Sequence, residues 1–283
     1  MLATLIEVLA IAERENFAIG AFNTPNLESL VAVIRAAEKF NVPVIISHAE
    51  LHEPVAPLET IGPIMVLMAK LAKVPVCVNL DHGESLDYLQ KALDIGFTAI
   101  MYDGSLLSYE KNVENTKKAV QMAKTTGANV EAEIGVMAGR EAGAHTGVKQ
   151  QEDLYTDPDL AKRFVEETGI DALAASFGTA HGIYKVKPKL DFDRIENINK
   201  LVNIPLVMHG GSGVSPEDYK TAISKGIRKI NYYSYMSREG VFAAKKLLSE
   251  EELTFYHDIA LTAEKAMQAD VERAMKVFYK ITL

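Results

Sequence analysis

Residues 75–83 read Pro-Val-Cys-Val-Asn-Leu-Asp-His-Gly, an apolar run that ends in polar residues and glycine. Its apolar residues are consecutive rather than alternating, which is typical of a parallel strand buried on both faces. An amphipathic stretch over residues 86–95 and a second apolar run over 98–103 follow it. These segments predict a strand–helix–strand unit that carries its polar side chains where each strand ends.

The same unit recurs along the whole chain. Further apolar runs of this kind lie at 17–23, 43–48, 129–135, 171–178, 204–210 and 227–232, and amphipathic stretches such as 27–40, 109–126 and 158–168 lie between them. The centres of the eight runs advance by about 30 residues, the size of one βα unit. We therefore predict a single-domain (β/α)8 TIM barrel over residues 1–283, with a helical tail at about 250–279. A doubly wound open sheet is the alternative, because periodicity does not distinguish the two.

The composition excludes several classes of protein. Hydrophobic residues make up 48% of the 283 residues, which excludes a disordered chain. The chain carries 38 acidic and 30 basic side chains, a net charge of −8 without any basic block, which argues against a nucleic-acid partner. Its apolar runs are shorter than the ~20 residues of a membrane span. The single Cys77 and the absence of an evident signal peptide predict a cytoplasmic protein.

Three of the seven histidines follow predicted strands, and each precedes a glycine. They are His82, His181 and His209. If the barrel closes, the three imidazoles meet at its mouth, because the carboxyl ends of the strands lie together. Three imidazoles and one open position are typical of a catalytic zinc site that polarises a substrate oxygen. The alternative is three separate histidines, each bonded to the backbone.

Other polar residues occupy the same predicted end of the barrel. Gly210-Gly211-Ser212-Gly213 follows the seventh strand, where barrels often bind phosphate, and Asn231 and Ser234 lie at the end of the next strand. An ordinary left-handed turn is the alternative for this glycine-rich segment. Asp81 places a carboxylate beside the predicted cation, either for chemistry or to orient a ligand.

The remaining histidines are expected to stay outside the metal site. We expect His48, which ends the second strand, to be solvated or to support the ligands from outside, and the alternative is that it joins the mouth. His145 and His257 have no strand context and are expected to be solvated. Residues 137–150, rich in glycine and alanine around Arg140 and Glu141, predict a mobile lid over the mouth.

Together these motifs identify a family resemblance that spans about residues 18–269. The matching segments are Ala21-Phe22-Asn23, Leu80-Asp81-His82-Gly83, Asp103-Gly104-Ser105, Glu131-Ala132-Glu133-Ile134-Gly135, Gly178-Thr179-Ala180-His181-Gly182, His209-Gly210-Gly211-Ser212-Gly213 and Lys229-Ile230-Asn231. The chain resembles the class II, metal-dependent ketose-bisphosphate aldolases, the group of fructose- and tagatose-bisphosphate aldolases. The resemblance implies reversible cleavage of a phosphorylated ketose to dihydroxyacetone phosphate and an aldehyde, by a homodimer or homotetramer.

The resemblance also implies a role for each matching residue. It implies that His82, His181 and His209 bind a catalytic Zn²⁺, which stabilises the enediolate. Asp81 is then the acid/base at the aldehyde oxygen, and Glu141 of the lid moves a proton at the enediolate carbon. The implied binding site for dihydroxyacetone phosphate and its phosphate consists of Gly182, Gly210, Ser212, Asn231 and Ser234. Asp103 and Glu133 match positions that can hold a second, non-catalytic divalent or monovalent cation.

The sequence departs from the family pattern on the aldehyde side of the site. Tyr233 replaces a small or acidic residue, and Tyr256-His257-Asp258 stands where an Asp-Pro-Arg-like element is usual. The serine or threonine that often follows the second strand is Ala49 or Glu50. We therefore expect an aldehyde other than glyceraldehyde 3-phosphate, with a different or an absent distal anion. The alternatives are a catalytically impaired sugar-phosphate-binding subunit, suggested by Tyr233, and a zinc hydrolase on the same barrel.

Overall fold

Eight parallel strands form a closed barrel in the computed structural model, which describes residues 1–135 and 155–281. The strands are β2 (Ile19–Asn23), β3 (Val44–Ala49), β4 (Val76–Gly83), β5 (Ala99–Tyr102), β6 (Asn129–Ile134), β7 (Ala172–Ala175), β8 (Leu206–Met208) and β9 (Ile227–Tyr232). The last strand pairs with the first, with Lys229 opposite Ile19. This pairing excludes an open sheet and confirms the predicted (β/α)8 barrel.

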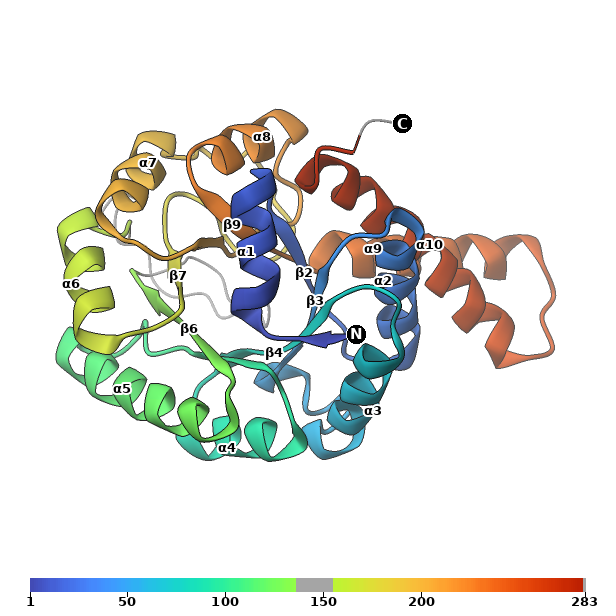
Figure 1. The fold of residues 1–283 in the computed structure, drawn as a ribbon. Helices are drawn as coiled ribbons and strands as arrows, with labels where there is room; N and C mark the ends of the chain where they lie inside the picture. The colour runs from blue at the N-terminus through green and yellow to red at the C-terminus, as the bar shows by residue number, and fades with distance from the viewer. Residues whose placement is uncertain (136–154, 282–283) are drawn as a thin grey trace.

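Helices surround the barrel and cover its outer face (Figure 1). They are α2 (Leu27–Phe40), α3 (Leu58–Leu71), α4 (Leu86–Ile95), α5 (Tyr109–Thr126), α6 (Pro158–Thr168), α7 (Phe192–Leu201) and α8 (Pro216–Ser224), and a short 3-10 turn, η1 (Glu50–His52), follows β3. The side chain of Asp157 accepts a hydrogen bond from the backbone N–H of Leu160 and so caps α6, whose first residue is Pro158. The predicted boundaries of α2, α4, α5 and α6 agree with the structure, because each helix begins after a capping residue.

The N-terminal residues close one end of the barrel, a feature that we did not predict. The two-residue strand β1 (Leu2–Ala3) pairs with β4, and helix α1 (Leu5–Glu15) follows and lies across the barrel end in Figure 1. The backbone N–H of Ile6 donates to Asn129 Oδ1 (3.0 Å) at the start of β6. The inward face of α1, including Leu5 and Leu9, is buried.

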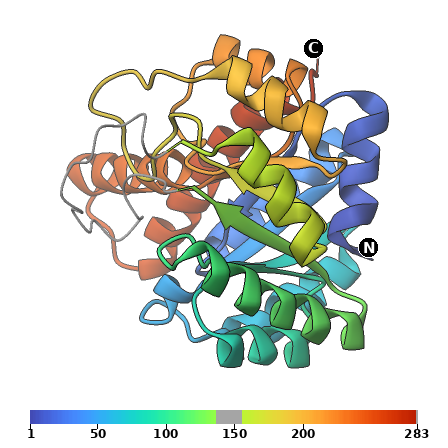
Figure 2. The same ribbon diagram turned by 90° about the vertical axis from the view of Figure 1, so that its left-hand side faces the viewer.

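The C-terminal helices form a hairpin that projects to one side of the barrel (Figures 1 and 2). The predicted helical tail over 250–279 corresponds to helix α10 (Tyr256–Phe278), which follows helix α9 (Ser234–Glu250) after a five-residue connection. Met267 and Met275 on α10 are buried, whereas the side chain of Leu261 is 46% exposed. No helix in residues 1–135 or 155–281 has both the length and the apolar character to span a membrane.

Candidate active site

The three strand-end histidines meet at the carboxyl end of the barrel. His82 lies on β4, His181 follows β7 and His209 directly follows β8. The ring centroids are 4.6 Å apart for His82–His209, 5.0 Å for His82–His181 and 5.9 Å for His181–His209. One nitrogen from each ring lies within 4.8 Å of the others, so the cluster can hold one metal ion.

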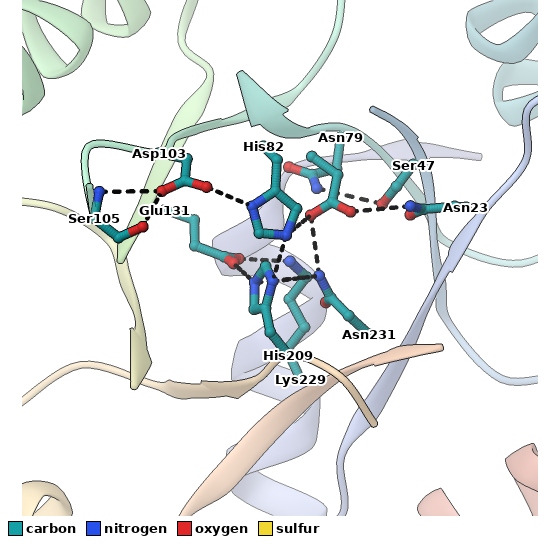
Figure 3. A network of polar contacts seen from close by, with 11 residues as sticks. Asn23, Ser47, Asn79, His82, Asp103, Ser105, Glu131, His209, Lys229 and Asn231 are labelled. Carbon is teal, nitrogen blue, oxygen red and sulfur yellow. Dashed lines mark hydrogen bonds and ion pairs between the residues drawn. The ribbon is translucent and has the colours of Figure 1, made fainter. Parts of the chain in front are cut away.

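Carboxylates on the outer side of the cluster orient two of the rings (Figure 3). His82 Nδ1 lies 2.9 Å from Asp103 Oδ2, and His209 Nε2 lies 2.7 Å from Glu131 Oε1. The remaining nitrogens, His82 Nε2 and His209 Nδ1, face each other at 2.9 Å. Each outer N–H donates to a carboxylate, so in the neutral rings both inner nitrogens present lone pairs. This arrangement of donors fits a cation placed between the imidazoles.

The charges around the cluster favour a positive charge at its centre. Burial opposes protonation of His82, but the Asp81 and Asp103 carboxylates raise its pKa to about 10. Burial, together with the neighbouring His82, lowers the pKa of His181 to about 3, and burial also lowers that of His209. The carboxylates therefore stabilise one positive charge among the rings, which either a proton or a metal ion can supply.

Asp81 is a buried carboxylate held from both sides. Asn23 Nδ2 donates to its Oδ2 (3.1 Å), and Asn231 Nδ2 donates to its Oδ1 (3.0 Å). Burial alone would raise the pKa of Asp81, but His82, His209 and other neighbours hold it well below the usual range. Asp81 is thus an ionised hydrogen-bond acceptor, 4.0 Å from His82 Nε2. The sequence did not reveal the contribution of Asn23.

An irregularity in β4 brings Asp81 and His82 into the same cluster. Neighbouring residues on a strand normally face opposite sides. Here the pairing of β4 with β5 shifts register between Leu80 and Gly83, and His82 has a φ of +48°. Residues other than glycine seldom adopt this left-handed conformation, which marks a local backbone strain at the site.

A second group of cation ligands adjoins the first. His82, Asp103 and Glu133 bring their ligand atoms together, so the two predicted second-cation residues lie side by side. Asp103 also accepts hydrogen bonds from the backbone N–H and hydroxyl of Ser105. Glu133 is buried, and its Oε2 has no hydrogen-bond partner within the described part of the chain. Burial and the neighbouring Asp103 raise the pKa of Glu133 well above its usual value.

The predicted phosphate-binding residues line one pocket beside the histidines. The pocket is lined by Gly182, Gly210, Ser212, Asn231 and Ser234 together with Asn23, Asp81, His181, Tyr232 and Tyr233. Gly210 has a φ of +60°, and a Cβ there would lie 2.5 Å from the carbonyl oxygen of Ala180, so only glycine fits. The hydroxyl of Tyr184 accepts from Ala180 N (2.8 Å) and donates to Gly210 O (2.9 Å), which ties the loops after β7 and β8 together.

Two further buried histidines, His48 and His52, lie near Tyr233. His48 is not solvated as expected, because it lies on the fully buried strand β3, where its Nε2 lies 3.3 Å from the hydroxyl of Tyr88. Its other expected role, support of the ligands from outside, stays a prediction. Burial, more than the nearby His52, lowers the pKa of His48 to about 4. The His52 ring packs on Tyr233 at a centroid distance of 5.1 Å. The expectation for His257 is confirmed, because its side chain is 68% exposed on α10.

Two buried charged residues were not assigned a role from the sequence. Glu131 and Lys229 are fully buried inside the barrel, and Lys229 Nζ lies 2.6 Å from Glu131 Oε2. A charged residue within an apolar strand run is the sequence signal that indicates such a buried pair. Glu141, Arg140 and His145 lie outside the described residues, as does the predicted lid over 137–150.

The chain matches known proteins over most of its length. The family model of the class-II fructose-bisphosphate aldolases matches residues 3–281. A fructose-bisphosphate aldolase from Thermus caldophilus is 41% identical over 254 residues, covering 82% of each chain. A sulfofructosephosphate aldolase from Alkalicoccus urumqiensis is 37% identical over 268 residues, covering 94% of this chain and 93% of that protein.

The likeness extends to three-dimensional structure. The crystal structure of the YdjI aldolase from Escherichia coli K12 superposes with a TM-score of 0.87 at 35% identity, covering 98% of this chain and 97% of that one. The structural neighbour thus shares the barrel over its full length. The protein belongs to the class-II fructose-bisphosphate aldolase family and is a lyase that cleaves sugar phosphates.

Proposed function

We propose that this protein is a zinc-dependent aldolase that reversibly cleaves a phosphorylated ketose to dihydroxyacetone phosphate and an aldehyde. One observation carries the proposal: inward-facing imidazole nitrogens of His82, His181 and His209 lie beside the ionised carboxylate of Asp81. A group of neutral nitrogen donors suits Zn²⁺, and a proton-transfer carboxylate next to it suits aldol chemistry.

The three histidines hold the catalytic ion in this proposal. A bound Zn²⁺ supplies Lewis-acid charge that stabilises the enediolate left by carbon–carbon cleavage. Asp103 and Glu133 are proposed to hold a second, non-catalytic cation. The buried Oε2 of Glu133 supports this, because it has no hydrogen-bond partner among residues 1–135 and 155–281.

Asp81 moves the proton at the aldehyde end of the breaking bond. In cleavage, its carboxylate takes the hydroxyl proton of the ketose, and in condensation it returns a proton to the aldehyde oxygen. Asn23 and Asn231 each donate to one carboxylate oxygen and thereby keep Asp81 in place. Glu141 is proposed to move the proton at the enediolate carbon.

The pocket beside the histidines is proposed to bind dihydroxyacetone phosphate. The proposed binding residues are Gly182, Gly210, Ser212, Asn231 and Ser234. Glycines let backbone N–H groups approach the phosphate closely, and the polar side chains of Ser212 and Asn231 add donors.

The aldehyde partner is proposed to lack a distal phosphate. His48 and His52 are buried, and the His52 ring packs on the half-buried Tyr233. Burial lowers the pKa of both imidazoles, so they carry no fixed positive charge near neutral pH. The names of the relatives, a fructose-bisphosphate aldolase and a sulfofructosephosphate aldolase, differ in the substrate they specify.

Steady-state cleavage assays test this substrate choice. We expect fructose 1-phosphate or tagatose 1-phosphate to be cleaved with a higher kcat/KM than the corresponding 1,6-bisphosphates. Efficient turnover of a bisphosphate with a low KM would contradict an aldehyde partner without a distal phosphate.

Metal removal tests the reaction itself. After dialysis against a chelator, the protein should lose proton exchange at the carbon of dihydroxyacetone phosphate, and Zn²⁺ should restore it. Exchange that is absent at every metal concentration, with sugar phosphate still bound, would favour the binding-subunit alternative.

We also propose a single catalytic domain over residues 1–283 that forms a homodimer or homotetramer. The α9–α10 hairpin exposes large apolar side chains, each at least 46% exposed: Val241, Phe242, Leu248, Phe255, Tyr256 and Leu261. Exposed apolar groups of this kind often belong to protein interfaces. Sedimentation velocity of the purified protein tests the oligomer, and a monomer at micromolar concentration would contradict it. The cytoplasmic location remains a prediction from the lone, buried Cys77.

A further inference from the structure

A buried ion pair crosses the interior of the barrel below the histidines (Figure 3). Lys229 on β9 and Glu131 on β6 are both fully buried, and they form a salt bridge of 2.6 Å. The interior of such barrels is usually filled by branched hydrocarbon side chains. A buried ion pair is often no more stabilising than well-packed hydrophobic residues, because both charges lose their hydration. Stability therefore does not explain why this pair is present.

The position of the pair suggests a role in orienting a metal ligand. One oxygen of Glu131 accepts from Lys229, and its other oxygen lies 2.7 Å from Nε2 of His209. A carboxylate can only accept hydrogen bonds, so Nε2 of His209 must carry the proton. The lone pair of the neutral ring then lies on Nδ1, which faces His82 Nε2 at 2.9 Å.

The contact of His209 differs from that of His82. The carboxylate beside His82 is Asp103, which also bonds Ser105 in the loop after β5. The carboxylate beside His209 is bonded to an ammonium group in the barrel interior, so its charge and its orientation are both set by the barrel itself. His209 is therefore connected through Glu131 to two strands of the barrel interior, β6 and β9.

We propose that Glu131 and Lys229 are positioning residues that select the metal-binding tautomer of His209. Glu131 accepts the Nε2 proton and holds the ring, and Lys229 keeps the carboxylate oriented with one oxygen toward His209. This inference rests on the metal centre in the proposed function.

The variant Glu131→Gln gives the sharpest test, because an amide has one acceptor oxygen instead of two. We expect Lys229 to take that oxygen, so the amide NH₂ faces Nε2 of His209 and favours the tautomer with the proton on Nδ1. Zn²⁺ affinity, measured by competition with a chromophoric chelator, should fall by roughly 10- to 100-fold.

The double variant Glu131→Gln/Lys229→Met separates tautomer selection from a merely structural role. Without the ammonium group, the amide can turn its oxygen toward His209, so the double variant should bind Zn²⁺ at least several-fold more tightly than Glu131→Gln. The visible spectrum of bound Co²⁺ should change in Glu131→Gln and return toward that of the unmodified protein in the double variant. Zn²⁺ binding in the double variant that is as weak as in Glu131→Gln, or weaker, would overturn the proposal.

Glu264→Gln is the matched control. Glu264 is a buried carboxylate on α10 that pairs with Arg35 on α2. Both helices lie outside the barrel (Figure 1), whereas the histidines lie at the carboxyl end of its strands. We expect this variant to lose stability and to keep its Zn²⁺ affinity. If Glu131→Gln loses no more Zn²⁺ affinity than Glu264→Gln, the proposal is wrong while the metal centre stands. If the unmodified protein itself binds no Zn²⁺, it is the proposed function that fails.

Discussion

The two ends of the barrel differ in chemistry. Helix α1 closes the N-terminal end with buried apolar side chains such as Leu5 and Leu9. The carboxyl end instead holds ionisable groups, among them the half-buried His82 and the buried Asp81, which lie beside one another. Buried charges cost free energy unless they are paired, whereas buried apolar area stabilises the fold. We conclude that stability is concentrated at one end and chemistry at the other, so substitutions should separate the two properties.

The largest expected effect is at the polar end. Asp81→Ala should keep the fold and the bound metal but lose cleavage by on the order of 10² to 10⁴, because the proton-transfer group is gone. Steady-state cleavage, metal content and thermal unfolding measure the three properties. His209→Ala is the comparison variant and should release the metal instead. Near-normal cleavage by Asp81→Ala would show that the assigned role is wrong.

The apolar end should respond in the opposite way. Leu9 on α1 is 1% exposed, and Leu9→Ala should lower the free energy of unfolding by about 2–5 kcal/mol through lost burial and a cavity. The kcat of the variant at a permissive temperature should stay near that of the unmodified protein. A large fall in kcat without loss of stability would show that α1 contributes to the site.

A smaller effect is expected at His48, which lies at the polar end but is buried like a core residue. Its pKa is lowered from 6.5 to about 4 by burial, so the native state disfavours its protonated form, which the unfolded chain takes up first. The contribution of neutral His48 to the free energy of unfolding is therefore fully present above about pH 6.5 and is lost as the pH falls from 6.5 to about 4. At ~1.4 kcal/mol per pKa unit, the loss is up to about 3 kcal/mol.

His48→Phe should make the stability of the metal-free protein less dependent on pH. Denaturant unfolding between pH 7 and 4.5 measures the slope for both proteins. Only the difference between them reports on His48, since burial also lowers the pKa of His181. Equal slopes would show that His48 titrates in the folded state as it does in the unfolded chain.

The regular parts of the fold could be predicted because local signals agree with packing. Helix α6 begins after Asp157 and contains Pro158 in its first turn, and its predicted and observed bounds coincide. Helix α1 and the connection between α9 and α10 at residues 251–255 were harder to predict. The role of α1 depends on the barrel end that it covers, and the connection separates two helices of similar amphipathic pattern.

The site was partly predictable for the same reason. His82 and His209 lie at strand ends and His181 lies in the loop after β7, and closure of the barrel brings these segments together. The Glu131–Lys229 pair depends on which residues of two distant strands face each other across the interior, and sequence spacing alone does not specify that contact. The burial of His48 likewise depends on Tyr88 and on the η1 turn around it.

The left-handed residue in β4 has a consequence for how the site tolerates motion. Thermal motion of a barrel changes the distances between its strands, so groups on separate strands move relative to one another. Asp81 and His82 are adjacent in the chain, and the φ of +48° at His82 turns both toward the same cluster. Covalent bonds, rather than inter-strand hydrogen bonds, therefore set the spacing between the proposed proton carrier and the proposed metal ligand. This spacing should persist in relatives whose loops and helices differ widely.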